Sequence, residues 1–203
     1  MKRNVFFTIV AIFAIQLGYA QVPVLVDFNS TGSGRSINVL ASKQFHNRHE
    51  LGGGICININ KQTLNDDQFC VFRKRMYSIQ PIEFFGVEGF YQIHFLKNLE
   101  HIDLFAFYDI QYRFSHCRSW FGDYTEEGKR IYILYGPFHW IEQNIGIGFS
   151  VDIWKNLFLI QRIGGGINLI VGYGKPDYNA MIAKPKTEWE FGYLLSSGIG
   201  YRF

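Results

Sequence analysis

The sequence contains few prolines and few cysteines, and after residue 20 it has no run of 18 apolar residues. A helix needs about 20 consecutive apolar residues to cross a bilayer, so the rest of the chain offers no candidate for a transmembrane helix. The number of cysteines is three, which is odd, and no closed disulfide framework is predicted. Two alternatives stay open for the loop cysteines: a Cys70–Cys117 bridge in an oxidising compartment, or free thiols.

An excess of charge of one sign is also missing. Lys and Arg exceed Asp and Glu by three over the whole chain, and by one when Lys2 and Arg3 are set aside. A chain this close to neutral has no global field that would attract nucleic acid. The six histidines have no spacing typical of a metal site. No nucleic-acid partner, metal or cofactor is therefore predicted.

The first twenty residues have the pattern of a secretory leader. Lys2 and Arg3 precede the apolar run 5–15, and small residues stand at the third and last positions before a cleavage site. We predict a cleavable signal peptide over residues 1–20 and a single domain over residues 21–203. The apolar run is too short to span a bilayer as a helix, although an uncleaved anchor helix is the alternative.

The last fifteen residues alternate between large apolar side chains and small or polar ones. The apolar set is Trp189, Phe191, Tyr193, Leu195, Ile199, Tyr201 and Phe203. A period of two over this length predicts a long β-strand with one apolar face. The aromatic content of 18% and the 21 glycines are typical of a membrane barrel, which has aromatic girdles outside and thin residues inside.

Earlier segments repeat this alternation. The connections between them are alternately short turns and long polar links. The predicted strands lie near 22–29, 35–46, 49–60, 80–96, 101–116, 138–153, 157–173 and 188–203. The long links cover 61–78, 118–136 and 174–187. We predict an all-β fold: an eight-stranded antiparallel up-and-down transmembrane β-barrel with short periplasmic turns and longer external loops. Pro23 suits the start of the first strand.

Each predicted strand has one apolar face and one small or polar face. The polar faces carry Glu88, His94, Asp109, Arg113, Glu142, Asp152, Arg162, Glu190 and Arg202. The exceptions are Gln143 and Gln161 on the apolar face and Phe90, Phe105 and Phe107 on the polar face. The interior of an eight-stranded barrel is barely wide enough for side chains to fill it, so the many large apolar residues do not fit inside. The apolar face is therefore predicted to meet lipid.

The leader, the eight alternating strands and the aromatic last residue resemble the small eight-stranded outer-membrane β-barrel proteins of Gram-negative bacteria. Phe203, Tyr201 and Ile199 match the apolar positions of the C-terminal assembly signal of that class, whereas Ser197 departs from it. The resemblance implies export through the secretory pathway, insertion by the barrel-assembly machinery, and contact with the lipid bilayer and lipopolysaccharide. It carries the fold and the location with it and no particular activity.

The charged residues of the polar faces have a structural and a functional interpretation. Unpaired charge in a narrow lumen is costly. This cost favours the structural interpretation, a salt-bridged network that fills the lumen, and disfavours the functional one, a path for protons or ions. The glycine triplets 52–54 and 164–166 would need to open a helix to bind phosphate. Because the period of two continues through both, they are better explained as curvature points and as space for bulky neighbours in the lumen.

The leading functional hypothesis is a non-enzymatic barrel in envelope integrity, adhesion or a larger envelope complex. Arg73, Lys74 and Arg75 in the first long link are candidates for contact with lipopolysaccharide or a partner protein, because arginine forks suit phosphate groups. The alternatives are a lipid A-modifying enzyme and a narrow conduit for small apolar molecules. No His-x-Ser motif places a nucleophile and a base on one strand face, and no catalytic residue is assigned.

Overall fold

The computed structural model describes residues 22–32, 34–46, 48–59, 67–69, 74–77, 84–99, 101–115, 120–124, 130–173 and 185–203. The strands are β1 (Pro23–Thr31), β2 (Gly34–Phe45), β3 (His49–Asn58), β4 (Asp67–Phe69), β5 (Lys74–Tyr77), β6 (Phe84–Leu99), β7 (Ile102–Ser115), β8 (Trp120–Tyr124), β9 (Arg130–Trp154), β10 (Leu157–Tyr173) and β11 (Pro185–Arg202). Within these ranges no helix has the length and the hydropathy to cross a membrane.

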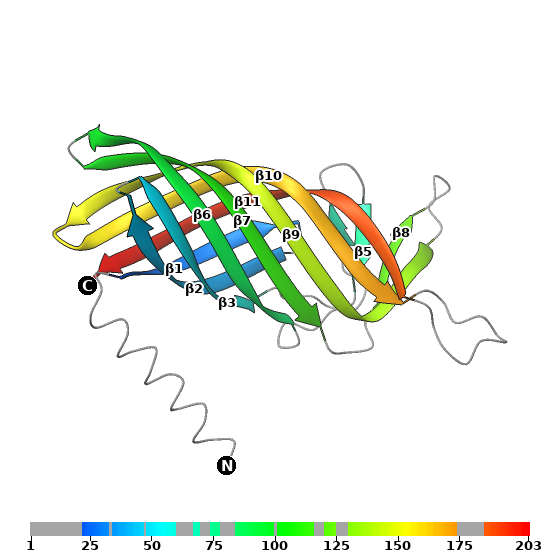
Figure 1. Cartoon of the computed structure of the whole chain (residues 1–203). Helices are drawn as coiled ribbons and strands as arrows, with labels where there is room; N and C mark the ends of the chain where they lie inside the picture. The colour runs from blue at the N-terminus through cyan, green and yellow to red at the C-terminus, as the bar shows by residue number, and fades with distance from the viewer. Residues whose placement is uncertain are drawn as a thin grey trace, which may run out of the picture.

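Eight of the strands close into an antiparallel barrel, as predicted. Their order around the ring is β1, β2, β3, β6, β7, β9, β10 and β11, and β11 pairs back with β1 (Figure 1). The sequence-adjacent strands of the barrel are neighbours in space, which is the up-and-down connection of this class of barrel. Because the ring is closed, every one of its strands is paired with a neighbour on both sides.

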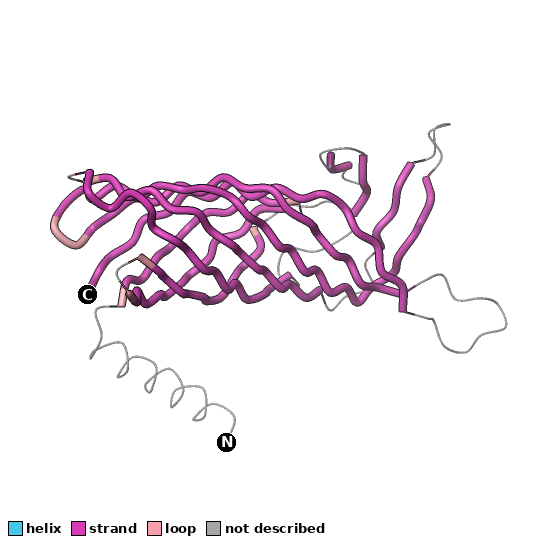
Figure 2. Tube along the Cα trace, turned by 45° about the horizontal axis from the view of Figure 1, so that its top comes forward, coloured by secondary structure: helices cyan, strands magenta, loops and turns pink. Residues whose placement is uncertain are grey.

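The short turns lie at one end of the barrel, the end at which the C-terminus lies (Figure 2). Two of them use a non-glycine residue with a left-handed backbone, His46 (φ 50°) and Lys155 (φ 40°). β1 begins at this end too, with Pro23 opposite Arg202. Proline at the first position of a strand removes no hydrogen bond from the middle of the ladder. The opposite end carries the longer connections, as predicted.

The structure differs from the sequence prediction in the long links 61–78 and 118–136. These segments contain β4, β5 and β8, which extend the sheet from the first third of β9 in the order β9-β8-β5-β4. β9 itself is 25 residues long and begins well before the predicted position 138. The added strands have three to five residues, which is too short for a period-two pattern to be recognised in the sequence.

The two faces of the barrel wall differ as predicted, with apolar side chains outside. On β9, Ile145 is 68% exposed whereas its neighbour Asn144 is 2% exposed. On β10, Ile163 points outward and Arg162 inward in the same way. A buried apolar cluster also lies inside the barrel and comprises Leu25, Leu40, Phe90, Phe105, Phe107, Phe158, Ile160 and Leu194. The three phenylalanines that broke the predicted pattern therefore do face the interior.

Inward-facing glycines make room for these rings. A Cβ on Gly52 would lie 2.3 Å from the ring of Phe90, and a Cβ on Gly148 would lie 2.5 Å from the ring of Phe105. Contacts this short do not occur between real atoms, so a larger residue would displace the ring. For Gly52 and Gly148, the interpretation as space for bulky neighbours is confirmed.

Candidate functional site: the polar network inside the barrel

Arg162 lies at the centre of the barrel interior, surrounded by three carboxylates. Its Nη2 donates a hydrogen bond to Glu88 Oε1 on β6 (3.0 Å) and another to Asp27 Oδ2 on β1. Asp109 on β7 places its Oδ2 3.8 Å from Nη1. None of these four side chains exposes any surface. We refer to Arg162, Asp27, Glu88 and Asp109 as the central network.

A serine and two aromatic rings fix the guanidinium of Arg162. Arg162 Nε donates to the Ser196 hydroxyl on β11 (3.3 Å), and that hydroxyl donates to Asp27 Oδ2 (2.9 Å). The rings of Phe90 and Phe107 lie 5.6 and 5.9 Å from the guanidinium carbon. A cation over an aromatic face at this distance is stabilised by the quadrupole of the ring. Charge, hydrogen bonds and ring contacts thus hold one arginine in one position.

Amide side chains from β1 and β2 satisfy the second oxygen of Glu88. Asn29 Nδ2 donates to Glu88 Oε2 at 3.2 Å, and Asn38 Nδ2 donates to the same oxygen. The thiol of Cys56 lies 3.9 Å from it. Cys56 is buried and is a free thiol. Glu88 therefore receives donors from three neighbouring strands as well as from Arg162.

A chain of hydrogen bonds along β7 connects the central network to a second arginine. Gln111 Nε2 donates to Asp109 Oδ1 (3.0 Å), and Arg113 Nη2 donates to Gln111 Oε1 (2.5 Å). Arg113 Nη2 also donates to the Ser36 hydroxyl on β2 (3.2 Å). The three β7 residues are two apart, so all of them point into the barrel.

Two further carboxylates lie nearer the end with the long connections. Glu142 on β9 accepts a hydrogen bond from the Thr31 hydroxyl (3.1 Å), and Glu190 on β11 accepts one from Asn168 Nδ2 (3.2 Å). Both carboxylates are buried. The polar lining of the barrel thus continues from the central network toward this end.

His94 forms a separate cluster near the end with the short turns. Its Nδ1 lies 2.7 Å from Asp103 Oδ2 and its Nε2 lies 3.1 Å from Glu50 Oε2, and Ser42 donates to Glu50. Glu50 and Asp103 were not among the predicted lumen residues. Their positions in the strands could have predicted that they face inward. Asp103 is an even number of residues from Asp109, and Glu50 from the inward-facing Cys56, so each pair points to the same face.

Two of the nine predicted lumen residues lie apart from the others. Arg202 and Asp152 form an ion pair at the rim near the short turns (2.5 Å), with side chains 39% and 41% exposed. The guanidinium of Arg202 also lies over the ring of Phe158, 4.4 Å from its centroid. The seven that are buried are Glu88, His94, Asp109, Arg113, Glu142, Arg162 and Glu190.

The buried charged side chains of the interior are held by ion pairs with one another and by hydrogen bonds to neighbouring amides and hydroxyls. Within the described residues, no group of three His, Cys, Asp or Glu side chains has the geometry to hold a metal ion. In the same part of the chain, no serine hydroxyl is hydrogen-bonded to a histidine. His139 bonds to the Tyr112 hydroxyl on the outer face, whereas Glu142 points inward.

The other residues singled out from the sequence are placed as follows. Tyr201 and Ile199 point outward from β11, Phe203 directly follows that strand, and all three side chains are exposed. Lys74 and Arg75 lie in β5. Arg73, Cys70, Cys117 and the predicted signal peptide lie outside the described residues.

No protein-family model matches the sequence, and no curated protein matches it. Solved structures similar to this chain include the N-terminal β-barrel domain of Pseudomonas aeruginosa OprF, with 10% identity, a TM-score of 0.42, and coverage of 90% of this chain and 96% of that one. Neisserial surface protein A has 12% identity, a TM-score of 0.36, and coverage of 90% and 94%.

A third similar structure is Ail, the attachment invasion locus protein of Yersinia pestis, with 13% identity, a TM-score of 0.40, and coverage of 91% and 99%. These neighbours are small eight-stranded outer-membrane barrels. The eight-stranded architecture of this chain is established by its own strand pairing.

Proposed function

We propose that this chain is an integral barrel of a Gram-negative outer membrane, closed to solutes along its axis, with a structural or binding role in the envelope and no catalytic activity. The observation that carries the proposal is the central network. Arg162 and its three carboxylates are fully buried and reach one another from β1, β6, β7 and β10, strands on different sides of the ring. Side chains that meet across a barrel of eight strands occupy the space that a channel would need.

The apolar outer wall supports the membrane location. Exposed Ile, Leu, Val and aromatic side chains cover the outer face of every barrel strand, and in water such a surface would exceed what monomeric proteins expose. In lipid the same surface is favourable, and the closed ring satisfies the backbone hydrogen bonds that a bilayer cannot. Export through the secretory pathway by a leader over 1–20, and insertion directed by Phe203, Tyr201 and Ile199, complete the proposal.

Conductance tests the closed interior. The protein reconstituted in planar lipid bilayers is expected to leave the current at the level of the bare bilayer, because ions entering the barrel meet buried, paired charges. A matched variant, Arg162→Ala with Glu88→Ala and Asp27→Ala, removes three of the four side chains of the central network and serves as the positive control for a detectable opening. Stepwise conductance by the unaltered protein would refute a closed barrel and favour a conduit.

The external side of the barrel is the proposed binding surface. Arg73, Lys74 and Arg75 precede or lie in the sheet that extends from β9, where their charges suit the phosphates of lipopolysaccharide or an acidic patch on an envelope protein. Replacing all three by glutamine is expected to weaken binding to lipopolysaccharide-containing vesicles and leave binding to zwitterionic vesicles unchanged. Equal binding of both proteins to both vesicles would argue against this contact.

A lipid A-modifying enzyme is the rival function. Mass spectrometry of lipid A from cells with and without this protein separates the two hypotheses. The proposed role predicts identical acylation in both samples. A change in the number or position of acyl chains would favour the enzyme.

A further inference from the structure

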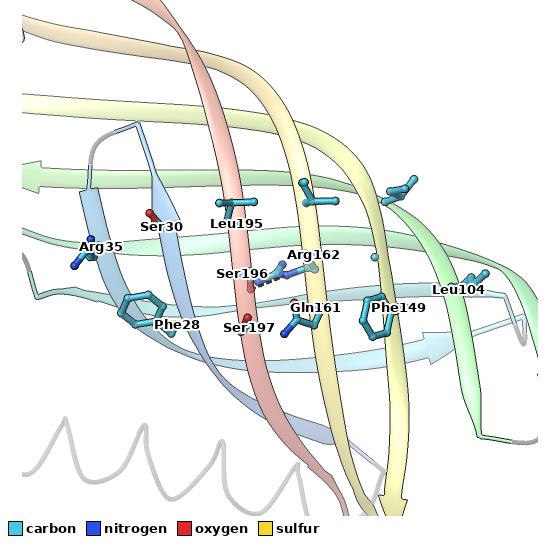
Figure 3. Close-up of a pocket in the computed structure, with 13 residues that line it drawn as sticks. Phe28, Ser30, Arg35, Leu104, Phe149, Gln161, Arg162, Leu195, Ser196 and Ser197 are labelled. Atoms are coloured by element: carbon cyan, nitrogen blue, oxygen red, sulfur yellow. Dashed lines mark hydrogen bonds between the residues drawn. The ribbon is translucent and has the colours of Figure 1, made fainter. Parts of the chain in front are cut away.

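A hollow interrupts the outer wall of the barrel where β1, β11, β10 and β9 run side by side. It has a volume of about 820 Å³, and Ser197 and Gln161 lie in it (Figure 3). The two residues are directly paired neighbours on β11 and β10. Phe28 pairs with Ser197 on one side, and Phe149 pairs with Gln161 on the other. We call these four residues, Phe28, Ser197, Gln161 and Phe149, the polar row.

The two polar side chains of this row have no partner within the described chain. Neither forms a hydrogen bond or an ion pair with another described residue, and both are exposed. Gln161 is four residues from the start of β10, which at strand rise and barrel tilt places it about 10 Å inside the wall, within the apolar band of about 25 Å. An amide without a hydrogen-bonding partner is unfavourable in hydrocarbon.

Other outward-facing polar groups of the wall differ in this respect. Gln143 accepts a hydrogen bond from the Tyr108 hydroxyl (3.0 Å), and His139 bonds to the Tyr112 hydroxyl (2.8 Å). His49 bonds in the same way to Tyr91 (2.6 Å). The polar row is thus a place where the wall presents polar groups that its own neighbours do not satisfy. Acyl chains have no donor or acceptor with which to satisfy them.

In two successive rows the order of residues across the four strands is close to symmetric, whereas the row on the other side, Ser30, Leu195, Ile163 and Ile147, has unlike ends. Read from β1 to β9, the polar row is aromatic, polar, polar, aromatic. The row below it is Val26, Ile199, Leu159 and Val151, again with matching ends and matching centre. Because barrel strands are tilted, this row is inclined to the membrane plane. A two-fold axis parallel to the membrane normal between β11 and β10 would therefore bring only its two central residues, Ser197 and Gln161, within side-chain reach of their counterparts in a second copy. Isologous contacts have this reciprocity.

From this arrangement we propose that two copies of the chain pair in the membrane through β10 and β11, with reciprocal Gln161–Ser197 hydrogen bonds across a two-fold axis parallel to the membrane normal. Glutamine and serine each carry a donor and an acceptor, so the same two residues can satisfy one another across that axis. The small Ser197 side chain leaves the space into which the longer Gln161 of the second copy extends. The proposal rests on the membrane location proposed above.

Sedimentation equilibrium in density-matched micelles, at several protein-to-detergent ratios, measures the association. The unaltered protein is expected to show a monomer–dimer equilibrium. The double variant Gln161→Leu, Ser197→Leu is expected to associate about tenfold more weakly, because two hydrogen bonds between membrane segments are lost. It places apolar residues at lipid-facing positions, so it should fold at least as well as the unaltered protein, which urea unfolding in vesicles checks.

Two matched variants make the test specific. Tyr108→Phe with Gln143→Leu removes a satisfied polar pair elsewhere on the wall and should leave dimerisation unchanged. Exchanging the two residues, Gln161→Ser with Ser197→Gln, keeps the reciprocal pairing and should retain the dimer. A protein that sediments as a monomer at all ratios, or a leucine variant that associates as tightly as the unaltered chain, would overturn the proposal. Failure of the chain to insert into vesicles would refute the membrane location instead.

Discussion

The middle of the barrel and its rim near the short turns both contain an arginine–carboxylate pair, but in different surroundings. Arg162 is fully buried and faces Asp27, Glu88 and Asp109, whereas Arg202 is 39% exposed and faces Asp152 alone. In the middle, each charge depends on the others for solvation that water cannot supply. At the rim, water and dissolved ions share that role. We therefore expect the loss of the buried pair to lower the stability of the barrel far more than the loss of the exposed pair.

The largest effect is expected for Arg162→Leu. The substitution leaves three buried carboxylates without their shared cation and should destabilise the barrel by about 3–5 kcal/mol, the cost of breaking a buried pair by removing one partner. Urea unfolding in lipid vesicles, followed by tryptophan fluorescence, measures the loss. Arg162→Lys, which keeps the charge, should lose less. If Arg162→Leu lowered the free energy of unfolding no more than a substitution at the rim, the buried pair and the exposed pair would contribute equally to stability.

The two aspartates beside Arg162 should differ in importance. Asp27 accepts hydrogen bonds from Arg162 and Ser196, whereas Asp109 is 3.8 Å from the guanidinium. Asp27→Asn is therefore expected to cost about 1.5–3 kcal/mol, the range for a hydrogen bond to a charged group, and Asp109→Asn less. The same unfolding assay applied to both variants gives the order. The reverse order would mean that Asp109 is the principal counter-charge.

Tight packing in the middle predicts a third difference. Gly148 faces inward, and a Cβ there would lie 2.5 Å from the ring of Phe105, whereas a Cβ on the outward-facing Gly165 has its nearest neighbour at 3.8 Å. Gly148→Ala is expected to cost about 1–3 kcal/mol through overpacking. Gly165→Ala is the control and should be neutral or slightly stabilising. Equal unfolding midpoints for the two alanine variants would show that the ring of Phe105 can move aside without a loss of stability.

The smallest effect is expected at the rim. Arg202→Gln should cost less than about 1 kcal/mol, as for other exposed ion pairs. Because salt screens exposed charges more than buried ones, raising the ionic strength should reduce this cost and leave that of Arg162→Leu unchanged. Unfolding at low and high salt tests both statements. A rim substitution that is insensitive to salt would indicate that the contact of Arg202 with Phe158 carries the stability.

The longer barrel strands could be predicted from the sequence because each keeps a period of two over ten or more residues, whereas the strand at 22–29 was predicted because a closed antiparallel barrel of this class has an even number of strands. The alternation also predicted that Arg162 and Glu88 lie on the inner face of the barrel wall and that Gln161 lies on the outer face. It could not show which inward residues meet, since Asp27, Glu88 and Arg162 come from strands that are not neighbours in the ring. Their contact depends on the stagger and tilt of the closed barrel.

Position along the strand was a second quantity that parity does not give. Asp152 and Arg202 have the inward parity, and for this reason both were predicted to lie in the lumen. They lie so near the end of their strands that water reaches them. The added strands β4, β5 and β8 escaped prediction because a segment of three to five residues offers too few positions to establish a period.

The pairing of the first strand with the last has a consequence for how the molecule is made. β1 and β11 join over Pro23–Thr31 and Leu194–Arg202, so the ring closes only when the first strand and the last strand meet. Asp27 on β1 reaches both Arg162 and Ser196, which are 135 and 169 positions away in the chain. Contacts of such long separation form slowly. Pairing of the first strand with the last therefore also brings Asp27 to Arg162 and Ser196, so the seam of the ring and its charged centre depend on the same contact.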